Sequence, residues 1–399
     1  MTLSREIWVG TYTADSGRDG VGIGVLRLSV ETLEPAQLAA PRASWLGRAV
    51  DAPSPSFVAV HPSLPIVYAV AERAGTVAAY RRAADVDGVP QLEPFGEPWA
   101  AGEAVCHIAV DPLGRYAVAS CWGDGRVVLY ELDPDGRIVS RFEGEPATDP
   151  HAAAALAEPD TAGMLARTGF APRTSRAHCS LMLPDGRIMS TDLGVDLVRV
   201  WNYQPGTGLV LDHEITLPFW SGPRHLIAHP NGTVLIVTEY SVEVVVLSTS
   251  SAVMDAGAVA TSSIVTSAGQ SASRLAAPPV LPRYTVVQIG PATARRAQPF
   301  DGGAEIALSA DAVFVYVTVR GSNTVTTLRV DDRGHVHPLA DTSSGGNWPR
   351  HHLVLGRTLL IAHERSSDVT LFDLDPETGL PVGPTQHIAV GAPTALVPA

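Results

Sequence analysis

The sequence predicts an all-β fold, a seven-bladed β-propeller whose ring is closed by pairing of the N- and C-terminal strands. Two observations support this prediction: short strands repeat along the whole chain, and each end of the chain carries an incomplete unit. A repeat of about 45 residues built from short strands and tight turns is typical of propeller blades. A closed ring leaves only short, protected sheet edges, and it forms one domain however long the chain is.

The repeat is clearest between residues 177 and 247, where two units follow each other. Each unit is interpreted as three short strands, connected by an Asp-Gly or Asn-Gly turn and then by a second tight turn. The first unit reads His178–Arg187, an apolar run that ends in Asp192–Asp196, and then Leu197–Trp201. The second reads Pro223–Gly232, an apolar run that ends in Glu239–Glu243, and then Val244–Leu247.

The same unit recurs before and after this region, and the two ends of the chain complete each other. Near the N-terminus, Ile7–Thr11 and Val25–Val30 supply a second and a third strand with no first strand before them. The tail Ala392–Pro398 supplies a first strand with nothing after it. First strands beginning near residues 55, 105, 177, 223, 303, 349 and 392 therefore predict seven blades.

Two stretches interrupt the period, and we interpret them as insertions in a single domain that spans residues 1–399. Residues 146–176 are rich in Ala and predict a helix from about Asp149 to Arg167. Residues 248–282 are rich in Ser, Ala and Thr, which fits a loop or an added edge hairpin. Since both leave the repeat intact, we expect solvated decoration rather than a lid.

Composition excludes several classes of function. The net charge is −13 without a basic patch, which argues against nucleic acid or an anionic membrane as a partner. All 28 basic residues are Arg, so there is no Lys for a Schiff base or a P-loop. The odd set of Cys106, Cys121 and Cys179 fits neither a disulfide framework nor a zinc site.

The N-terminus and the hydropathy pattern bear on where in the cell the protein is found. The first residues contain no apolar signal-peptide core, and no apolar run approaches the ~18 residues of a membrane span. We expect a cytoplasmic protein, a monomer or weak homodimer, with no cofactor and no metal.

Charged residues gather where the predicted strands begin and end. Because neighbouring strands in a blade are antiparallel, the start of each first strand lies beside the end of each second strand, at one mouth of the central channel. The first of these positions collects Ser56, Cys106, His178, Arg224, Ala304 and Arg350. The second collects Glu72, Trp122, Asp192, Glu239, Arg320 and Glu364, with Tyr12 near it. Crowded charges must pair with one another or serve a ligand, so we expect a binding site, with a purely structural network as the alternative.

The remaining histidines are expected to have other roles. His107, His225 and His351 lie one residue beyond the first position, so strand alternation predicts that they turn towards the opposite face. Packing or hydrogen bonding between blades is the expected role for these three. His61 and His229 precede Pro in turns, and no spacing groups the histidines as metal ligands.

These residues resemble the lactonase family of seven-bladed propellers, which includes propeller-type 6-phosphogluconolactonases and 3-carboxy-cis,cis-muconate lactonizing enzymes. The resemblance extends over essentially the whole chain apart from the two insertions, and Cys106 departs from it because relatives often have His there. The matching segments are Val9–Thr13, Pro55–Phe57, His178, Pro184–Arg187, Asp192–Asp196, Gly222–His225, His229–Gly232, Glu239 and Arg320–Asn323. The resemblance implies an active site made of His178, Arg224, Glu239 and Arg320 on successive blades.

The leading hypothesis is a lactonase that hydrolyses a sugar-type or anionic lactone. His178 or Glu239 would be the general base, and Arg224 and Arg320 would bind the oxyanion and the anionic group of the small-molecule substrate. The expected substrate-binding residues are Arg350, Asp192, Glu72, Glu364, Trp122 and Cys106.

Three other hypotheses remain open on the same residues. One is cycloisomerization of a muconate-type dicarboxylic acid, in which the arginines would bind carboxylates. Another is a propeller that binds an anion or a protein without catalysis. The third is a calcium-dependent lactonase whose oxygen ligands would be Glu72, Asp192, Glu239 and Glu364, although the flanking arginines argue against a cation there.

Overall fold

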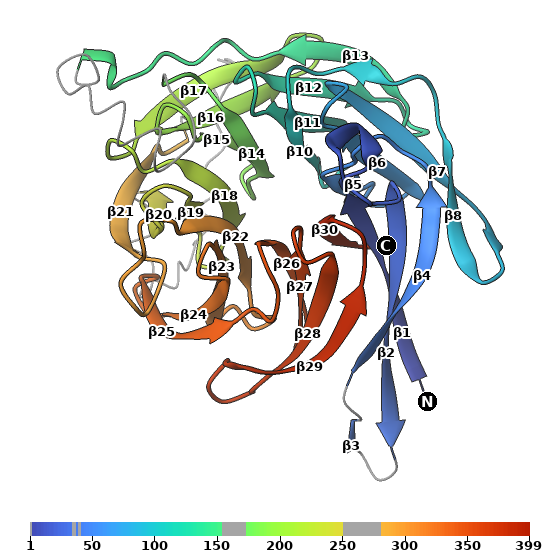
Figure 1. Cartoon of the computed structure of the whole chain (residues 1–399). Helices are drawn as coiled ribbons and strands as arrows, with labels where there is room; N and C mark the ends of the chain where they lie inside the picture. The colour runs from blue at the N-terminus through green and yellow to red at the C-terminus, as the bar shows by residue number, and fades with distance from the viewer. Residues whose placement is uncertain (1, 34–36, 39–40, 154–172, 250–280) are drawn as a thin grey trace, which may run out of the picture.

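The protein, described by a computed structural model over residues 2–33, 37–38, 41–153, 173–249 and 281–399, is a ring of β-sheets (Figure 1). Its strands form seven separate antiparallel sheets around a central axis. The innermost strands contact their neighbours all the way round, which closes the ring. The predicted all-β, seven-bladed propeller is confirmed.

We number the blades 1 to 7 around the ring in chain order. In blades 1 to 6, the strands follow one another along the chain from the inside of the ring to the outside. Blade 1 has a fifth short strand, β9, paired with β7. The strands of blades 1 to 3 are β5 (Val58–Val60), β6 (Ile66–Ala71), β7 (Thr76–Val86), β8 (Val89–Pro94) and β9 (Trp99–Ala100); β10 (Val105–Val110), β11 (Tyr116–Cys121), β12 (Val127–Leu132) and β13 (Ile138–Glu143); β14 (Ala177–Met182), β15 (Ile188–Asp192), β16 (Leu197–Gln204) and β17 (Gly208–Thr216).

Blades 4 to 6 repeat the same order. Their strands are β18 (Pro223–Ala228), β19 (Val234–Thr238), β20 (Glu243–Thr249) and β21 (Tyr284–Pro291); β22 (Gly302–Leu308), β23 (Phe314–Arg320), β24 (Thr324–Val330) and β25 (Val336–Ser343); β26 (Pro349–Leu355), β27 (Thr358–His363), β28 (Asp368–Leu374) and β29 (Pro381–Ala389).

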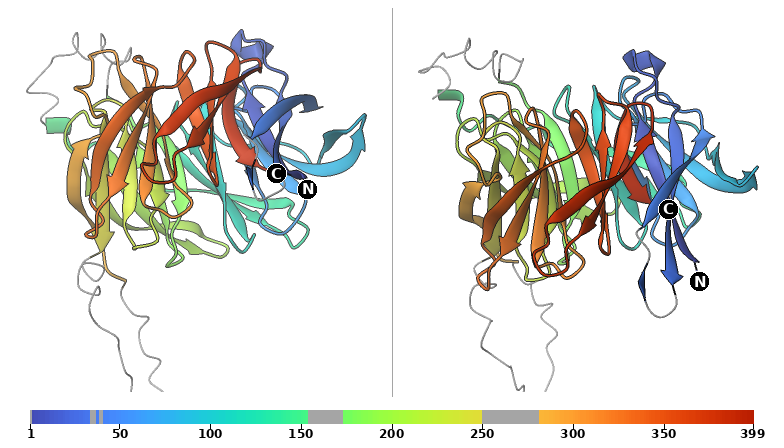
Figure 2. Two further views of the ribbon diagram at one scale, coloured as in Figure 1. Left: turned by 90° about the horizontal axis from the view of Figure 1, so that it is seen from below. Right: turned by 60° about the horizontal axis from the view of Figure 1, so that its bottom comes forward.

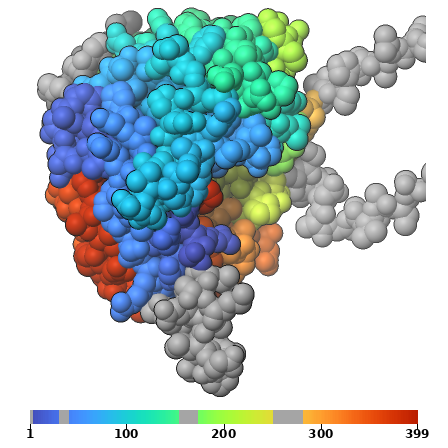
Figure 3. Space-filling model, turned by 90° about the vertical axis from the view of Figure 1, so that its right-hand side faces the viewer, coloured from blue at the N-terminus to red at the C-terminus, as the bar shows by residue number. Residues whose placement is uncertain are grey.

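Blade 7 closes the ring with both ends of the chain. The innermost strand is the C-terminal β30 (Pro393–Pro398), which pairs with β1 (Thr2–Thr11) so that Ile7 lies opposite Pro398. The strands β2 (Ile23–Leu33), β3 (Gln37–Leu38) and β4 (Arg42–Val50) complete the sheet, and the 3₁₀ helix η1 (Ala14–Ser16) lies between β1 and β2. The two termini lie close together in the side views (Figure 2). Seen from the right-hand side of Figure 1, the blue N-terminal residues lie between the red C-terminal residues and the lighter blue residues of blade 1 (Figure 3). The predicted closure through the termini is confirmed.

Each blade has four main strands rather than the three that the repeat predicts. The additional outer strands face solvent and are buried at few positions; in β29, only two of the nine side chains are buried. Inner strands are covered on both faces by neighbouring blades, and all seven residues of β23 are buried. The apolar runs that were recognised in the sequence are therefore the inner strands, because burial on both faces selects continuous apolar sequence.

The hydrophobic core consists of separate clusters between adjacent blades. Tyr68, Ile108 and Tyr130, for example, belong to one cluster between blades 1 and 2. Burial of each such side chain contributes about 1.5–3 kcal/mol, which makes the ring a rigid support for the residues at its mouth.

The two predicted insertions fall between β13 and β14 and between β20 and β21. Most of the helix predicted from Asp149 to Arg167, and nearly all of residues 248–282, lie outside the described residues. Within the described part of the chain, no helix has the length and apolarity needed to cross a membrane.

Candidate functional site

One repeated hydrogen bond fixes the side chains at the mouth of the channel. In blade 4, the backbone N–H of Glu239 donates to the carbonyl of Gly222, immediately before β18, at 2.7 Å. The same bond joins Glu72 to Ser54, Trp122 to Ala104, Leu193 to Arg176, Glu364 to Trp348 and Tyr12 to Ala392. The residue that follows each second strand therefore lies beside the start of the first strand, as the sequence predicts.

Blades 4 and 5 contribute a group in which two arginines share one carboxylate. The Oε2 atom of Glu239 lies 3.1 Å from Nε of Arg224 and 2.7 Å from Nη2 of Arg320. Arg224 also donates to the backbone carbonyl of Ala304, and Arg320 to that of Gly303. Since two guanidinium groups share a single carboxylate, this half of the mouth carries an excess positive charge.

A glycine permits this close approach of blades 4 and 5. A Cβ atom at Gly303 would overlap the carbonyl oxygen of Thr238, the last residue of β19. Only glycine fits between the two strands, so the blades can bring Arg320 against Glu239.

The charges in this group determine its protonation states. Burial alone would raise the pKa of Glu239, but the neighbouring Arg320 and Arg224 outweigh it and lower that pKa. Burial, together with the charge of Arg320, lowers the pKa of Arg224 to about 10. Glu239 is therefore an ionised, firmly held partner of two cations, which makes it a weak proton acceptor.

His178 lies at the same mouth on β14 and is a neutral imidazole. Burial and the nearby Arg224 hold the pKa of His178 well below its ordinary value. Its Nδ1 atom is buried and, within the described residues, has no hydrogen-bond partner. A neutral ring with an available nitrogen can accept or donate a proton.

Further buried polar atoms around the mouth lack partners in the described part of the chain. They are Nε of Arg320, Oγ of Ser56 and Oγ1 of Thr394. Leaving such an atom unpaired costs about 1–3 kcal/mol, so a polar ligand at the mouth would gain by pairing with it. Ser56 and Thr394 occupy the positions in blades 1 and 7 that correspond to His178 in blade 3.

The opposite half of the mouth is an ion-pair cluster in which charges balance. Arg350 lies 3.5 Å from Glu364 and 3.9 Å from Glu72, and Arg18 lies 3.1 Å from Glu364. The hydroxyl of Tyr12 donates to Glu72 at 2.8 Å. Burial alone would lower the pKa of Arg350, but Tyr12 and the two glutamates raise it above its ordinary value. The predicted Arg350, Glu72 and Glu364 are thus brought together and paired with one another.

Two other predicted residues lie on the blade 2 side of the mouth. The thiol of Cys106 donates to the backbone carbonyl of His178, and burial raises its pKa to about 12. It therefore remains a protonated thiol. The guanidinium of Arg176 stacks over the ring of Trp122, 4.1 Å from its centre.

The register prediction for Asp192 is off by one residue. Asp192 is the last residue of β15 and pairs with Ala177, so Leu193 occupies the mouth position of blade 3. The carboxylate of Asp192 instead accepts hydrogen bonds from Ser175 and from backbone N–H groups of Arg176 and Gly194. It stabilises its own turn.

The orientation predicted for three histidines is wrong. Pairing between the first and second strands shifts register at the mouth position in blades 2 to 6, which interrupts strand alternation. His107, His225 and His351 consequently turn into the channel, where all three rings contact Phe57. We call the ring of residues at this level the histidine layer; it consists of Phe57, His107, Cys179, His225, Glu305, His351 and Ala395. Hydrogen bonding between blades, the role expected for these histidines, is confirmed for His107 and His351, which accept from the backbone N–H groups of Ser180 and Leu396.

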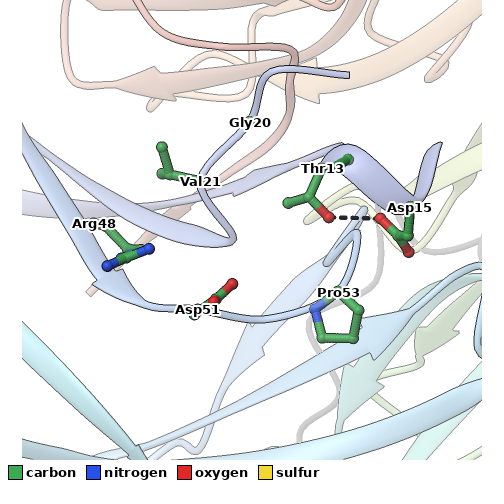
Figure 4. Close-up of a pocket in the computed structure, with 8 residues that line it drawn as sticks. Thr13, Asp15, Gly20, Val21, Arg48, Asp51 and Pro53 are labelled. Atoms are coloured by element: carbon green, nitrogen blue, oxygen red, sulfur yellow. Dashed lines mark hydrogen bonds between the residues drawn. The ribbon is translucent and has the colours of Figure 1, made fainter. Parts of the chain in front are cut away.

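A separate hollow of about 570 Å³ lies between the N-terminal loop and the end of β4 (Figure 4). Its lining includes Thr13, Asp15, Arg48 and Asp51. The carboxylate of Asp15 already accepts hydrogen bonds from Thr13 and Ser54. We place the candidate site at the mouth rather than here, because the mouth holds the histidine, the excess cation and the unpartnered buried atoms.

The carboxylates of the mouth form ion pairs with arginines. Across the described ranges, no group of three or more His, Cys, Asp or Glu side chains is arranged to hold a metal ion. Glu72, Glu239 and Glu364 each face a guanidinium group instead.

Comparisons with known proteins agree with this fold. Residues 6–398 match a family model described as a seven-bladed β-propeller lactonase. The chain is 24% identical to 6-phosphogluconolactonase of Bacillus subtilis over 385 residues, which cover 93% of this chain and 92% of the relative. A protein from Lactobacillus plantarum superposes with a TM-score of 0.74 at 19% identity over the full length of both chains. The periplasmic gluconolactonase of Pseudomonas aeruginosa superposes with a TM-score of 0.71 at 22% identity over 99% of each chain. At these identities, the two structural similarities support the fold alone.

Proposed function

The chain belongs to the family of seven-bladed β-propeller lactonases, and we propose that it hydrolyses an anionic, sugar-type lactone at the mouth of the channel. The expected substrate class follows the 6-phosphogluconolactonase of Bacillus subtilis, to which the chain is similar over most of its length. Only a small molecule is required as partner.

The observation that supports this proposal best is the excess positive charge beside a neutral histidine. Arg224 and Arg320 share the single carboxylate of Glu239, and Nε of Arg320 remains without a partner in the described structure. A guanidinium group binds phosphate, carboxylate or an oxyanion through paired hydrogen bonds. An anionic ligand would neutralise the excess charge and satisfy the free donor.

The proposed mechanism uses His178 as the general base. His178 takes a proton from a water molecule while the water oxygen forms a bond to the lactone carbonyl carbon. Arg224 and Arg320 stabilise the negative charge that develops on the carbonyl oxygen. The ring C–O bond then breaks, and the leaving oxygen takes the proton back from His178, which yields the open hydroxy acid.

Glu239 serves this reaction by holding both arginines. Its carboxylate is occupied by both guanidinium groups, whereas Nδ1 of His178 has no hydrogen-bond partner within the described residues, which supports His178 as the base in this proposal. Without Glu239, two buried guanidinium groups would repel each other.

Cycloisomerization of a dicarboxylic acid is the competing reaction. Arg350 provides a third guanidinium group at the same mouth, which would suit a second carboxylate. Its pairing with Glu72 and Glu364 makes this less favourable, because a substrate would have to replace those partners.

Substrate assays test the proposal. Purified protein is compared with its Glu239→Gln and Arg224→Met variants on 6-phosphogluconolactone, gluconolactone and a muconate-type dicarboxylic acid, with folding checked by circular dichroism. We expect hydrolysis of a lactone that both substitutions reduce. Turnover of the muconate alone would support the competing reaction, and unchanged turnover in both variants would refute the proposed site.

A further inference from the structure

The histidine layer lies directly beneath the mouth and contains one carboxylate. Glu305 is 7% exposed, and the side chains of His107, His225 and His351 around it are buried to a similar degree. The hydrolytic mechanism leaves Glu305 without a role. A buried carboxylate that is retained among histidines requires an explanation, because burying such a group is costly unless its charge is used.

Glu305 lies between two imidazole rings. Its Oε2 atom is 2.7 Å from Nδ1 of His225 and 3.3 Å from Nε2 of His351, and its Oε1 atom accepts from the N–H of Ile306 at 3.0 Å. Neither ring is aligned for a linear hydrogen bond to Oε2. A nitrogen and an oxygen 2.7 Å apart must nevertheless share a proton, because two lone pairs would repel at that distance.

The positions of these protons follow from the other contacts. Nδ1 of His351 accepts from the backbone N–H of Leu396, so the proton of that ring is on Nε2 and faces Glu305. Because an ionised carboxylate can only accept, the short contact with Glu305 in this state assigns the proton of His225 to Nδ1. The Nε2 atom of His225 is then an acceptor.

His225 connects Glu305 to the proposed base. The rings of His225 and His178 are 5.1 Å apart, at 62° to each other. Besides burial, Arg224 and Arg350 act electrostatically on both His178 and His225 and lower the pKa of each ring. His107 acts in the same sense on the pKa of His178, and Arg320 and His352 on that of His225. When His178 takes up a proton, its positive charge develops among these cationic and neutral groups. The negative charge of Glu305, next to His225, would offset part of that cost.

We propose that Glu305 is a positioning residue for lactone hydrolysis, which acts through His225 to orient His178 and to support the positive charge that His178 acquires. This inference rests on the proposed function. As in the Ser-His-Asp triad, a buried carboxylate would hold a histidine in one tautomer; here that histidine lies beside the base instead of being the base.

Kinetics of matched variants provide the first test. Glu305→Gln removes the charge and keeps the shape; we expect kcat to fall at least about tenfold, less than the 10²–10⁴-fold expected for loss of a general base, with KM changed less than about threefold. His213→Gln is the control, because His213 is also buried but pairs with Asp212 in the outer strand β17, and its kcat should stay within about twofold. In a His225→Asn background, Glu305→Gln should have little further effect, because the two residues act as one unit.

An NMR measurement tests the inference without turnover. The ¹⁵N shifts of the imidazole nitrogens should show the Nδ1–H tautomer of His225 in the wild type and loss of that preference in Glu305→Met. If the wild type hydrolyses no lactone, the proposed function fails, and this readout still decides whether Glu305 sets the state of His225. An unchanged kcat in Glu305→Gln, or an unchanged tautomer in Glu305→Met, would overturn the inference.

Discussion

The two halves of the channel mouth contain similar residues in different balance. In blades 4 and 5, Arg224 and Arg320 share the carboxylate of Glu239. Across the mouth, Arg350 and Arg18 face two carboxylates, Glu72 and Glu364, with Tyr12 bound to one of them. One half thus keeps a positive charge and an unpartnered donor, whereas the other half is neutral.

This difference in charge balance distinguishes the half that can bind an anion from the half that has a structural role. The neutral cluster joins blade 6 and blade 1 to residues of the N-terminal segment, at the place where the ring closes. The charged half lies beside His178 between blades that are continuous in sequence. Charged residues at a propeller mouth can therefore fasten the ring or receive an anion, and their local balance indicates which.

The largest expected effect is the loss of His178. His178→Asn keeps a polar side chain but removes the base, so kcat should fall about 10²–10⁴-fold. Initial-rate kinetics on the best lactone substrate measure this. A kcat within threefold of wild type would show that the base lies elsewhere.

The second prediction compares arginines from the two halves. Arg320→Met should lower kcat/KM about 10²–10³-fold, because it removes a donor to the developing oxyanion. Arg350→Met is the matched variant and should change kcat/KM less than about tenfold. Equal losses in both variants would remove the distinction between the halves.

In the stability of the fold, by contrast, Arg350→Met should have the larger effect of the two variants. Arg350→Met leaves Glu364 and Glu72 without their shared partner at the ring closure. Because this cluster is only partly buried, we expect a loss of about 1–3 kcal/mol in the free energy of unfolding, measured by urea denaturation. An unchanged denaturation midpoint would contradict the fastening role.

The pH profile should be flat in the neutral range. Burial and Arg224 lower the pKa of His178 below 6.5, so the neutral, active form of the ring is already complete at pH 6.5 and is lost only as the pH falls through the depressed pKa. We expect kcat/KM to change less than about twofold between pH 6.5 and 8. A steep rise with pH in that range would indicate a base with an ordinary pKa.

The smallest expected effect is that of a chelator. The carboxylates that a calcium ion would need already face arginines, so EDTA should leave turnover unchanged. Loss of activity in EDTA, restored by calcium, would favour the calcium-dependent alternative.

Much of this architecture could be predicted because the inner strands and their turns have a clear sequence pattern that repeats along the chain. Apolar runs and Gly turns mark the inner strands, and the unmatched ends at Ile7 and Pro398 predict the closure. Outer strands such as β29 were missed, since few of their side chains are buried and their pattern is weak.

Part of the site could also be predicted from the strand pattern. Alignment on strand ends brought Arg224, Glu239 and Arg320 together, because backbone pairing fixes those positions. It displaced Asp192 because β16 begins with the apolar Leu197, whereas β20 begins with the charged Glu243, so counting back from the first apolar residue ends one residue too early in blade 3. It also turned His225 the wrong way, because a register shift within β18 leaves no signal in a single sequence.

A crystal structure with a phosphosugar acid such as 6-phosphogluconate would test the central claim most directly. We predict that an anionic group of the ligand lies within hydrogen-bond distance of Nε of Arg320, beside His178, while Arg350 keeps its contacts with Glu72 and Glu364. An anion seated against Arg350, with Arg224 and Arg320 keeping only the contacts that they have now, would contradict the account.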